Sequence, residues 1–245
     1  MSGNFFSRLT HGERIDTFPE FTAGDLEAFI DSRTLEYPTQ LEDTFVDRAL
    51  KLGVESGMVL DVGTQVGLIA LKLLWQNENF FSIGVDSSSV MIDRARETAT
   101  AWNLAERAFF QVGDARRMRL KSSYFDLVVC DRVFHRFSDP VSVLSEIGRV
   151  LKPKGALLIR DYRRPNRFRM SQLINELSRG YGERMRPQIE GALRGAYTLR
   201  EMERMIGQSE LQGVRLVEFD DLHIGIEREG TTDPNSWVSA REQYR

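Results

Sequence analysis

Carboxylate residues mark the ends of four short apolar runs in this chain. Asp61, Asp86 and Asp131 close or directly follow three of these runs, and Asp114 comes two residues after another. If the runs are parallel strands, ligands should bind beyond their carboxyl ends. A carboxylate placed there can accept hydrogen bonds from the paired hydroxyls of a ribose or from an exocyclic amine of adenine. The four acids therefore predict a site for a nucleoside-containing ligand.

The segment Asp-Val-Gly-Thr-Gln-Val-Gly at 61–67 predicts a tight turn at the first of these ends. Gly63 and Gly67 allow the backbone to turn sharply and to approach a ligand closely. A helix that starts after them would offer free N–H groups. A nicotinamide dehydrogenase would instead need Gly-x-Gly-x-x-Gly directly after the strand, so it is the weaker alternative.

The elements that would position these residues alternate between strand and helix. The strand candidates are 58–62, 80–85, 108–112, 125–130 and 156–160, and the helices between them are expected at 66–75, 89–102 and 141–151. Such alternation predicts an α/β domain with helices on both faces of a parallel sheet. Two further runs, 214–219 and 222–227, predict an antiparallel hairpin at one edge. The expected fold is a doubly wound, mostly parallel, seven-stranded sheet.

The chain divides into an arm, one domain and a tail. Residues 1–40 lack sustained periodicity, which predicts an N-terminal arm or lid and not a core element. The main domain is expected at 41–229, opening with a helix at 41–52. A cap over the substrate, with a helix at 171–177, is expected as an insertion at about 163–198, and a helix at 199–206 follows it. Residues 230–245 predict a flexible tail.

The motifs, taken in order, resemble those of class I methyltransferases that use S-adenosylmethionine. Residues 59–67 (Val-Leu-Asp-Val-Gly-Thr-Gln-Val-Gly) resemble the first binding motif, and those at 83–87, 112–115, 125–131 and 150–156 follow in the family's order. The resemblance covers roughly residues 41–162. It is strongest for the branch with the ubiquinone- and menaquinone-biosynthesis enzymes. It implies a Rossmann-like fold and methyl transfer to a small-molecule acceptor, with S-adenosylhomocysteine as product.

The same resemblance implies roles for the matched residues. Those expected along the methionine portion of the cofactor are Tyr37, Asp61, Gly63, Thr64, Gln65, Gly67, Asp131 and Arg132. Those expected around the ribose and adenine are Asp86, Ser87, Met91, Gly113, Asp114 and Ala115. Asp86 would hold the ribose hydroxyls, and Asp114 would accept the adenine amine.

Gln65 departs from the family pattern, which usually has glycine at this position. Glutamine adopts a positive φ only at a cost on the order of 1 kcal/mol. Its side chain would either hydrogen-bond the ligand or obstruct the pocket. This departure keeps open the alternative of a non-catalytic relative that binds S-adenosylmethionine or a protein partner.

Methyl transfer from a sulfonium needs an acceptor atom in line with the methyl group, and a general base only if the acceptor is protonated. His135, just past the fourth strand, is the candidate base, although a purely structural histidine is the more frequent case. Arg163 and Arg164, past the fifth strand, are candidates for binding an anionic acceptor group, the alternative being solvated arginines.

The N-terminal arm carries the aromatic residues Phe5, Phe6, Phe18 and Phe21. They are expected either to close over the site as a lid that excludes water or to pack as ordinary apolar residues.

Charge is unevenly distributed along the chain. Residues 152–204 carry 13 basic and 6 acidic residues, although the whole chain has a net charge of −3. Solvated helix faces with local ion pairs explain this pattern, and an RNA methyltransferase remains a further alternative. Aromatic residues in the basic segment are scattered, unlike a stacking platform for bases, so nucleic acid is not the expected partner.

Composition limits the remaining possibilities. The single cysteine, Cys130, lies in an apolar run and predicts a small buried side chain. Three histidines and one cysteine without ligand spacing predict no metal site. No apolar run approaches the roughly 18 residues of a membrane span, and no signal peptide is evident, so a cytoplasmic protein is expected.

Overall fold

The computed structural model describes residues 14–18, 22–32 and 36–232 of the chain. Seven strands form one sheet within this part: β1 (Gly57–Val62), β2 (Phe80–Asp86), β3 (Ala108–Val112), β4 (Phe125–Asp131), β5 (Leu151–Tyr162), β6 (Arg215–Glu218) and β7 (His223–Arg228). Their order is β3-β2-β1-β4-β5-β7-β6. Strands β1 to β5 are parallel, and β7 runs antiparallel to both β5 and β6. The predicted mixed sheet with a C-terminal hairpin is confirmed.

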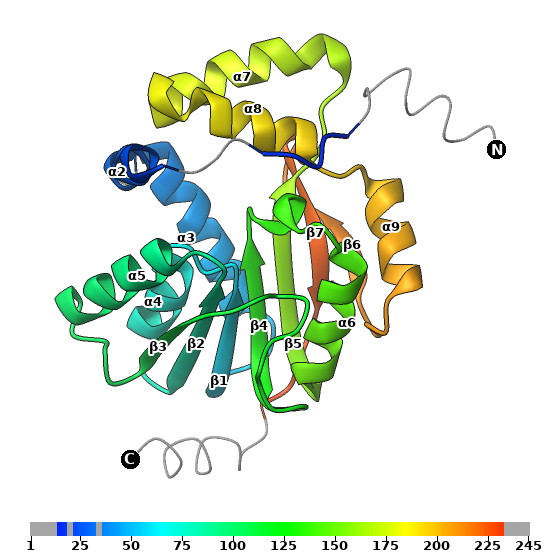
Figure 1. The fold of residues 1–245 in the computed structure, drawn as a ribbon. Helices are drawn as coiled ribbons and strands as arrows, with labels where there is room; N and C mark the ends of the chain where they lie inside the picture. Colours follow the sequence, from blue (N-terminus) through cyan, green and yellow to red (C-terminus); the bar gives the residue numbers. More distant parts are fainter. Residues whose placement is uncertain (1–13, 19–21, 33–35, 233–245) are drawn as a thin grey trace.

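Helices cover both faces of this sheet (Figure 1). On one face lie α3 (Glu36–Leu50), α4 (Leu68–Gln76) and α5 (Ser89–Ala101), and on the other lie α6 (Pro140–Val150) and α9 (Leu199–Gln208). Each group buries its own hydrophobic cluster against the sheet. Because both faces are covered, β1 and β4 are buried at every position, which explains their continuous apolar sequences.

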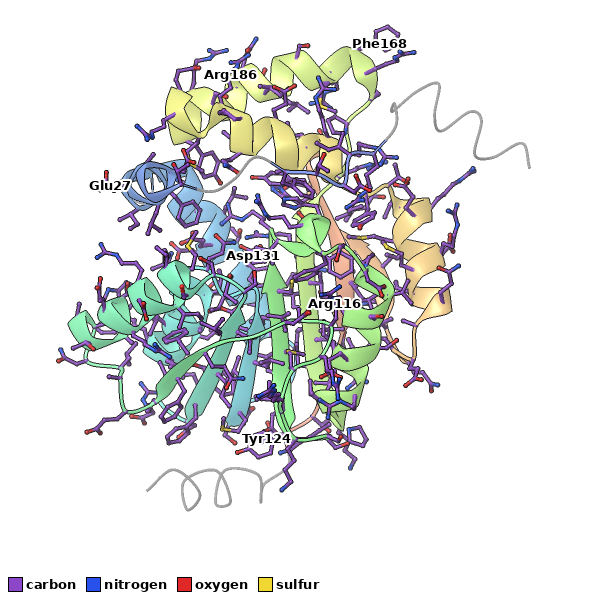
Figure 2. All side chains as sticks on the ribbon, in the orientation of Figure 1. Glu27, Arg116, Tyr124, Asp131, Phe168 and Arg186 are labelled. Carbon is purple, nitrogen blue, oxygen red and sulfur yellow. The ribbon has the colours of Figure 1, made fainter. Side chains whose placement is uncertain are left out.

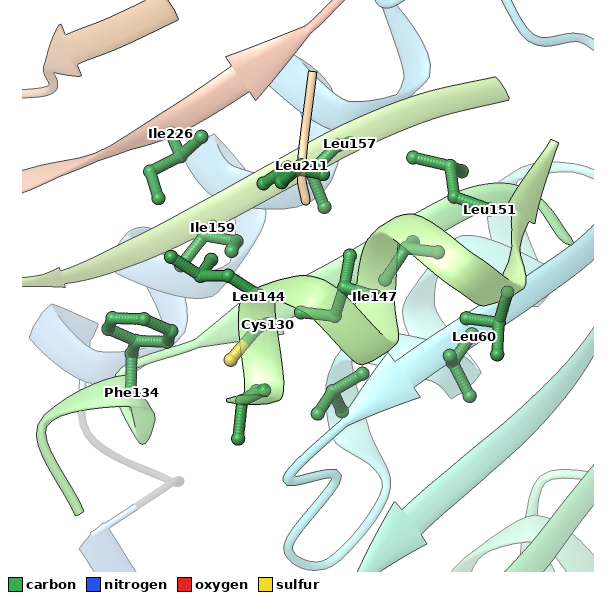
Figure 3. Packing of buried hydrophobic residues seen from close by; sticks show 14 of the residues in the cluster. Leu60, Cys130, Phe134, Leu144, Ile147, Leu151, Leu157, Ile159, Leu211 and Ile226 are labelled. Carbon is green, nitrogen blue, oxygen red and sulfur yellow. The ribbon is translucent and has the colours of Figure 1, made fainter. Parts of the chain in front are cut away.

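Cys130, on β4, lies inside one of these clusters, close to Leu144 of α6 (Figure 3). Leu144 and Ile147 project from α6 toward the same core. Asp139 caps this helix by accepting the backbone N–H of Ser142 at 3.1 Å. Burial raises the pKa of the Cys130 thiol well above its usual value. The predicted small buried side chain is confirmed.

The turn between β1 and α4 requires its two glycines. Gly63 has φ 71° and Gly67 has φ 81°, both in the left-handed region. A Cβ at position 63 would lie 2.4 Å from the Val133 side chain, and one at 67 would lie 2.8 Å from the Phe110 ring. Gln65, between them, also adopts a positive φ of 52°, as its place in the motif indicated. The turn is therefore fixed by backbone conformation and close packing together.

A cap of α7 (Arg167–Tyr181), η2 (Glu183–Met185) and α8 (Arg186–Gly195) lies over the carboxyl ends of the parallel strands (Figure 1). Both helices fall within the expected insertion. Helix α7 is longer than the predicted 171–177, because Asn166 caps it early by accepting the N–H groups of Phe168 and Arg169. Helix α8 was not predicted, since its apolar residues are few and two glycines interrupt them.

The N-terminal region differs from the expected arm. It contains a helix, α2 (Ala23–Ser32), and α3 starts at Glu36 instead of 41. Phe29 of α2 is buried in a cluster with the cap helices, so the expectation that 1–40 holds no core element is wrong. Leu26, Phe29 and Ile30 have helical spacing, but α2 has only 10 residues, too few for a sustained pattern.

Parts of the predicted ends lie outside the described residues, namely Phe5, Phe6, Phe21 and 233–245. Residues 230–232, expected within the tail, are held in place. The N–H of Gly230 donates to the Leu52 carbonyl at 2.7 Å, and that of Thr232 donates to the Gly53 carbonyl at 3.1 Å. Within the described residues, no helix combines the length and apolar character needed to cross a bilayer.

We expect Gly67→Ala to lower the free energy of unfolding by about 1–3 kcal/mol, because the added methyl meets the Phe110 ring at a positive φ. Urea denaturation measures the change. Gly207→Ala in α9 is the matched control: nothing lies within 4 Å of its added Cβ, so it should leave stability unchanged or raise it. Equal effects of the two substitutions on the free energy of unfolding would contradict the requirement for glycine at position 67.

Candidate functional site

A cavity of about 770 Å³ lies between the carboxyl ends of the strands and the cap. Its volume falls within the roughly 300–1,000 Å³ typical of small-molecule sites. The chain grows outward from β1 to β3 and then returns to β4, so the cavity sits where the strand order reverses. Ten of the sequence-predicted residues line it: Gly63, Gln65, Asp86, Ser87, Met91, Gly113, Asp114, Ala115, Arg132 and His135.

Asp86, at the end of β2, presents a carboxylate to this cavity. Its oxygens accept backbone N–H groups from Gln65 at 3.0 Å and Ser88 at 2.9 Å. Burial raises the pKa of Asp86, and these hydrogen bonds oppose the rise. Within the described residues Asp86 forms no ion pair, so its remaining lone pairs can accept two hydroxyls. The positive φ of Gln65 serves this arrangement by directing its N–H at Asp86.

Asp114 follows β3 and is more open to solvent. Arg116 pairs with its carboxylate at 2.6 Å, and this hydrogen bonding lowers the pKa of Asp114. Both side chains of the pair are half exposed; Arg116 is labelled in Figure 2. Ala115 lines the same wall, so its backbone stands beside the carboxylate as the sequence indicated.

A small side pocket lies beneath the β1 turn. It is lined by Glu42, Asp61, Gly63, Thr64, Gln65, Asp131 and Arg132, among others. Asp61 accepts the Thr64 hydroxyl at 2.7 Å. Burial raises the pKa of Asp61 to about 7, and the neighbouring carboxylates Asp131 and Asp86 contribute to the rise. The pocket therefore favours a cation, such as a ligand ammonium, that would stabilise the ionised acid.

Asp131, at the end of β4, is buried between two arginines (Figure 2). Arg160 donates to it at 2.8 Å and Arg132 at 3.0 Å. Burial alone would raise the pKa of Asp131, but the two guanidiniums hold it far below its usual value. Arg132, at φ 54°, also donates to the Tyr181 hydroxyl of the cap at 2.5 Å. The network thus links the strand ends to the cap.

His135 sits in a short 3-10 helix, η1 (Phe134–Arg136), after β4 and lines the cavity. Its Nδ1 lies 2.8 Å from Oδ1 of Asp161, a fully buried carboxylate on β5. Asp161 also accepts the backbone N–H groups of His135 and Tyr162, which fixes its orientation. An acceptor at Nδ1 selects the tautomer with the proton on that nitrogen. Nε2 then carries a lone pair, and among the described residues it has no hydrogen-bond partner.

The N-terminal segment covers this histidine. Phe18 packs edge-on against the His135 ring at 5.6 Å between centroids. Arg14 donates to the carbonyl of His135 at 2.7 Å and to that of Gly195 at 2.7 Å. The segment 14–18 therefore bridges η1 and the cap, a placement that suits the exclusion of water predicted for the arm.

Four predicted residues are not brought to the cavity or lack a described side chain. Gly67 packs under Phe110 and acts through the turn. Arg163 pairs with Glu218 at 2.6 Å, and the buried Arg164 pairs with Glu201 at 2.8 Å; neither lines the cavity. The Tyr37 side chain lies outside the described part of the structure. Arg186 and Arg194 of the basic segment form local ion pairs with Glu183 and Glu190, as the solvated-helix interpretation indicated.

Several cavity residues were missed from sequence. The walls from α2 and the cap are largely apolar: Phe29, Met185, Ile189 and Ala192. No local signal could have placed them there, because they come from separate helices. Asp161 was missed since β5 was expected to end at Arg160 but continues to Tyr162. The rule of strand-end carboxylates would have found it.

Comparison with known proteins agrees with this geometry. A family model described as a methyltransferase domain matches residues 54–211. The demethylmenaquinone methyltransferase of Deinococcus radiodurans is 34% identical over 172 residues, covering 62% of this chain and 68% of that enzyme. The chain belongs to the methyltransferase family. It is therefore a transferase whose cofactor is S-adenosylmethionine, and neither a dehydrogenase nor an RNA enzyme is favoured.

Two further relatives show the extent of the likeness. A ubiquinone/menaquinone biosynthesis C-methyltransferase of Geotalea daltonii is 27% identical over 137 residues. The matched region covers 49% of this methyltransferase and 58% of the Geotalea enzyme. The solved structure of an S-adenosyl-L-methionine-dependent methyltransferase from Methanococcus maripaludis superposes with TM-score 0.68 at 18% identity, covering 89% of this chain and 97% of that one. The latter likeness confirms the fold.

The donors and acceptors of the cavity fit the cofactor. Asp86 offers free acceptor capacity for a ribose, and the Asp61 pocket favours an ammonium group. Close packing at the cavity wall requires glycine at 63 and 113, because a Cβ would collide with Val133 at the first position and crowd Val85 at the second. The acceptors at Asp86 and Asp61 therefore suit a ligand that carries hydroxyls and an ammonium group.

We expect Asp86→Asn to weaken S-adenosylhomocysteine binding by roughly 10- to 100-fold, because an amide replaces a charged acceptor of two hydroxyls. Isothermal calorimetry gives the Kd. Asp93→Asn is the control, since Asp93 is an exposed acid on α5 that pairs with Arg96 and does not line the cavity. A loss below threefold for Asp86→Asn would argue against its role at the ribose.

We expect S-adenosylhomocysteine to bind more tightly as pH rises from 6 to 8. The pKa of Asp61 is about 7 in the free protein, so its carboxylate is mostly neutral at pH 6 and mostly ionised at pH 8. Only the ionised form attracts the ammonium of the ligand, and the affinity should change several-fold across this range. Calorimetry at both pH values measures it. In Asp61→Asn the affinity for S-adenosylhomocysteine should change little between pH 6 and 8. A wild-type affinity that decreases as the pH rises would contradict this prediction.

Proposed function

We propose that this methyltransferase acts on a small molecule whose reacting atom carries a proton, and that His135 removes that proton. The observation that supports this most directly is the Nε2 of His135, a buried nitrogen without a partner among the described residues on the cavity wall. His223 also has a buried Nε2 without a partner among the described residues, but it does not line the cavity. The position of the His135 Nε2 on the cavity wall is therefore what supports its role as a base.

Asp161 positions this base. By accepting from Nδ1, its carboxylate orients the imidazole and stabilises the imidazolium formed when Nε2 takes a proton. S-adenosylmethionine, when bound, supplies a methyl group already activated by its sulfonium. The chain's own residues then have three tasks: Asp86 and Asp61 hold the ligand, His135 accepts the proton at Nε2, and the cap excludes water.

The walls of the cavity indicate the character of the acceptor. Phe29, Met185, Ile189 and Tyr162 present apolar and aromatic surface to the cavity that His135 also lines. This surface suits a ring system or hydrocarbon body. The names of the Deinococcus and Geotalea relatives, which refer to menaquinone and ubiquinone, support a quinol-type acceptor as one member of this class.

The proposal is tested by mass spectrometry of ligands that copurify with the protein, followed by measurement of S-adenosylhomocysteine release with hydroxyarenes and quinols as acceptors. Recovery of S-adenosylmethionine or its demethylated product, and release that depends on an acceptor, are the expected results. Tight cofactor binding without turnover on any protic acceptor would instead favour the non-catalytic alternative.

His135→Gln should lower kcat by about 100- to 10,000-fold, the usual contribution of a general base, while leaving the Kd of S-adenosylhomocysteine within about threefold. His223→Gln is the matched control. His223 is also buried, with Nδ1 2.9 Å from Asp220 and an Nε2 that lacks a partner in the described structure, but it does not line the cavity. A similar loss of kcat in both variants would show that burial of a histidine, and not its position, matters.

A further inference from the structure

Most of the cationic and histidine side chains that line the cavity are engaged by an acid. Arg132 is engaged by Asp131 and Tyr181, and Arg116 is engaged by Asp114. His135 is held by Asp161. Among the described lining residues this leaves one cation, Arg136, without a carboxylate partner.

Arg136 follows His135 directly in η1, and its side chain is open to solvent within the cavity lining. Among the described residues, the guanidinium of Arg136 makes one hydrogen bond, which is long and neutral, from Nη1 to the amide oxygen of Gln188 on α8 at 3.4 Å. The Phe18 ring lies 5.1 Å from the guanidinium carbon. The surrounding protein lowers the pKa of Arg136 by desolvation, with Asp86 and Asp161 opposing this from a distance. An arginine stays charged under such conditions.

A partly desolvated guanidinium with one face on an aromatic ring is suited to a planar anion. Its fork of N–H donors matches a carboxylate in two parallel hydrogen bonds. Gln188, on the cap side, adds a polar group that also lines the cavity. The apolar surfaces of Met185 and Ile189 lie on the same cap and would cover the rest of such a molecule.

The charge around the site favours a monoanion over a phosphate dianion. Asp86 and Asp161 both act on Arg136, so the neighbourhood is already rich in negative charge. A single uncommitted arginine balances one further negative charge but not two. A carboxylate satisfies this limit.

We propose that Arg136 binds a carboxylate on the acceptor, so that the substrate is an apolar or aromatic acid with its reacting group near His135. This inference rests on the proposed function, because it concerns the acceptor half of the same cavity. It replaces the expectation that Arg163 and Arg164 bind an anion, since both are paired outside the cavity. Adjacent residues of one short helix would thus fix the acid and the reacting group.

The test compares acids with their matched primary amides as ligands of the full chain saturated with S-adenosylhomocysteine. The pairs are 4-hydroxybenzoate with 4-hydroxybenzamide, 4-hydroxycinnamate with its amide, and 3-hydroxy-2-naphthoate with its amide. Calorimetry or thermal shift gives the preference for each acid. We expect at least one acid to bind roughly 10- to 100-fold more tightly than its amide, the usual value of hydrogen bonds to a charged group.

In Arg136→Gln this preference should fall to within threefold, and Arg136→Lys should retain part of it, because lysine keeps the charge without the fork. Arg194→Gln is the control: it removes an exposed cation of the same cap that pairs with Glu190 and does not line the cavity. The Arg194→Gln variant should prefer the acids over their amides as strongly as the wild type does. No preference for any acid in the wild type, or a preference that survives in Arg136→Gln, would overturn the proposal.

The same measurements separate this inference from the proposed function. S-adenosylhomocysteine binding is measured first in wild type and in Arg136→Gln, and both should bind equally. If neither protein binds S-adenosylhomocysteine, the proposed function fails. The acid and amide pairs, titrated without S-adenosylhomocysteine, still decide whether Arg136 recognises a carboxylate.

Discussion

The structure depends on a charged side chain buried where the parallel strands end. Asp131 is almost inaccessible to solvent, and an isolated carboxylate there would be costly. Arg160 from β5 and Arg132 from the turn after β4 balance it, and Arg132 continues to Glu42 of α3 and Tyr181 of the cap. One buried charge thus ties together the sheet, the first helix of the domain and the cap. Removing Asp131 would leave the buried guanidinium of Arg160 without its carboxylate, so these elements are held in one arrangement.

This arrangement defines a cavity whose two sides differ in character. The strand ends supply carboxylates and glycines, whereas α2 and the cap supply apolar walls. η1 lies between them and carries both His135 and Arg136. The unusual Gln65 belongs to the cofactor side. Its left-handed conformation directs an N–H to Asp86, so the backbone keeps the geometry of the motif despite the larger side chain.

Much of the fold could be predicted because its signals are local. Buried parallel strands produce continuous apolar runs, and these runs alone predicted β1 to β5. Strand β5 is longer than predicted at both of its ends. Helix α8 and helix α2 were missed, since short helices with few apolar residues give weak periodicity. The expected arginine site was misplaced for a different reason: ion pairing depends on residues distant in sequence, such as Glu218 and Glu201.

The sequence by itself determined the class of fold, the strand-end acids and the family, because each is encoded in short segments whose spacing reflects backbone geometry. It also singled out His135, which the structure places on the wall of the cavity. Only the tertiary structure decided that Asp161 orients this histidine, that Tyr181 and Phe29 close the cavity, and that Arg136, not Arg163 or Arg164, is the cation left uncommitted. These are contacts between elements far apart in the chain. Their energies depend on which charges and surfaces folding brings together, and no local pattern records that.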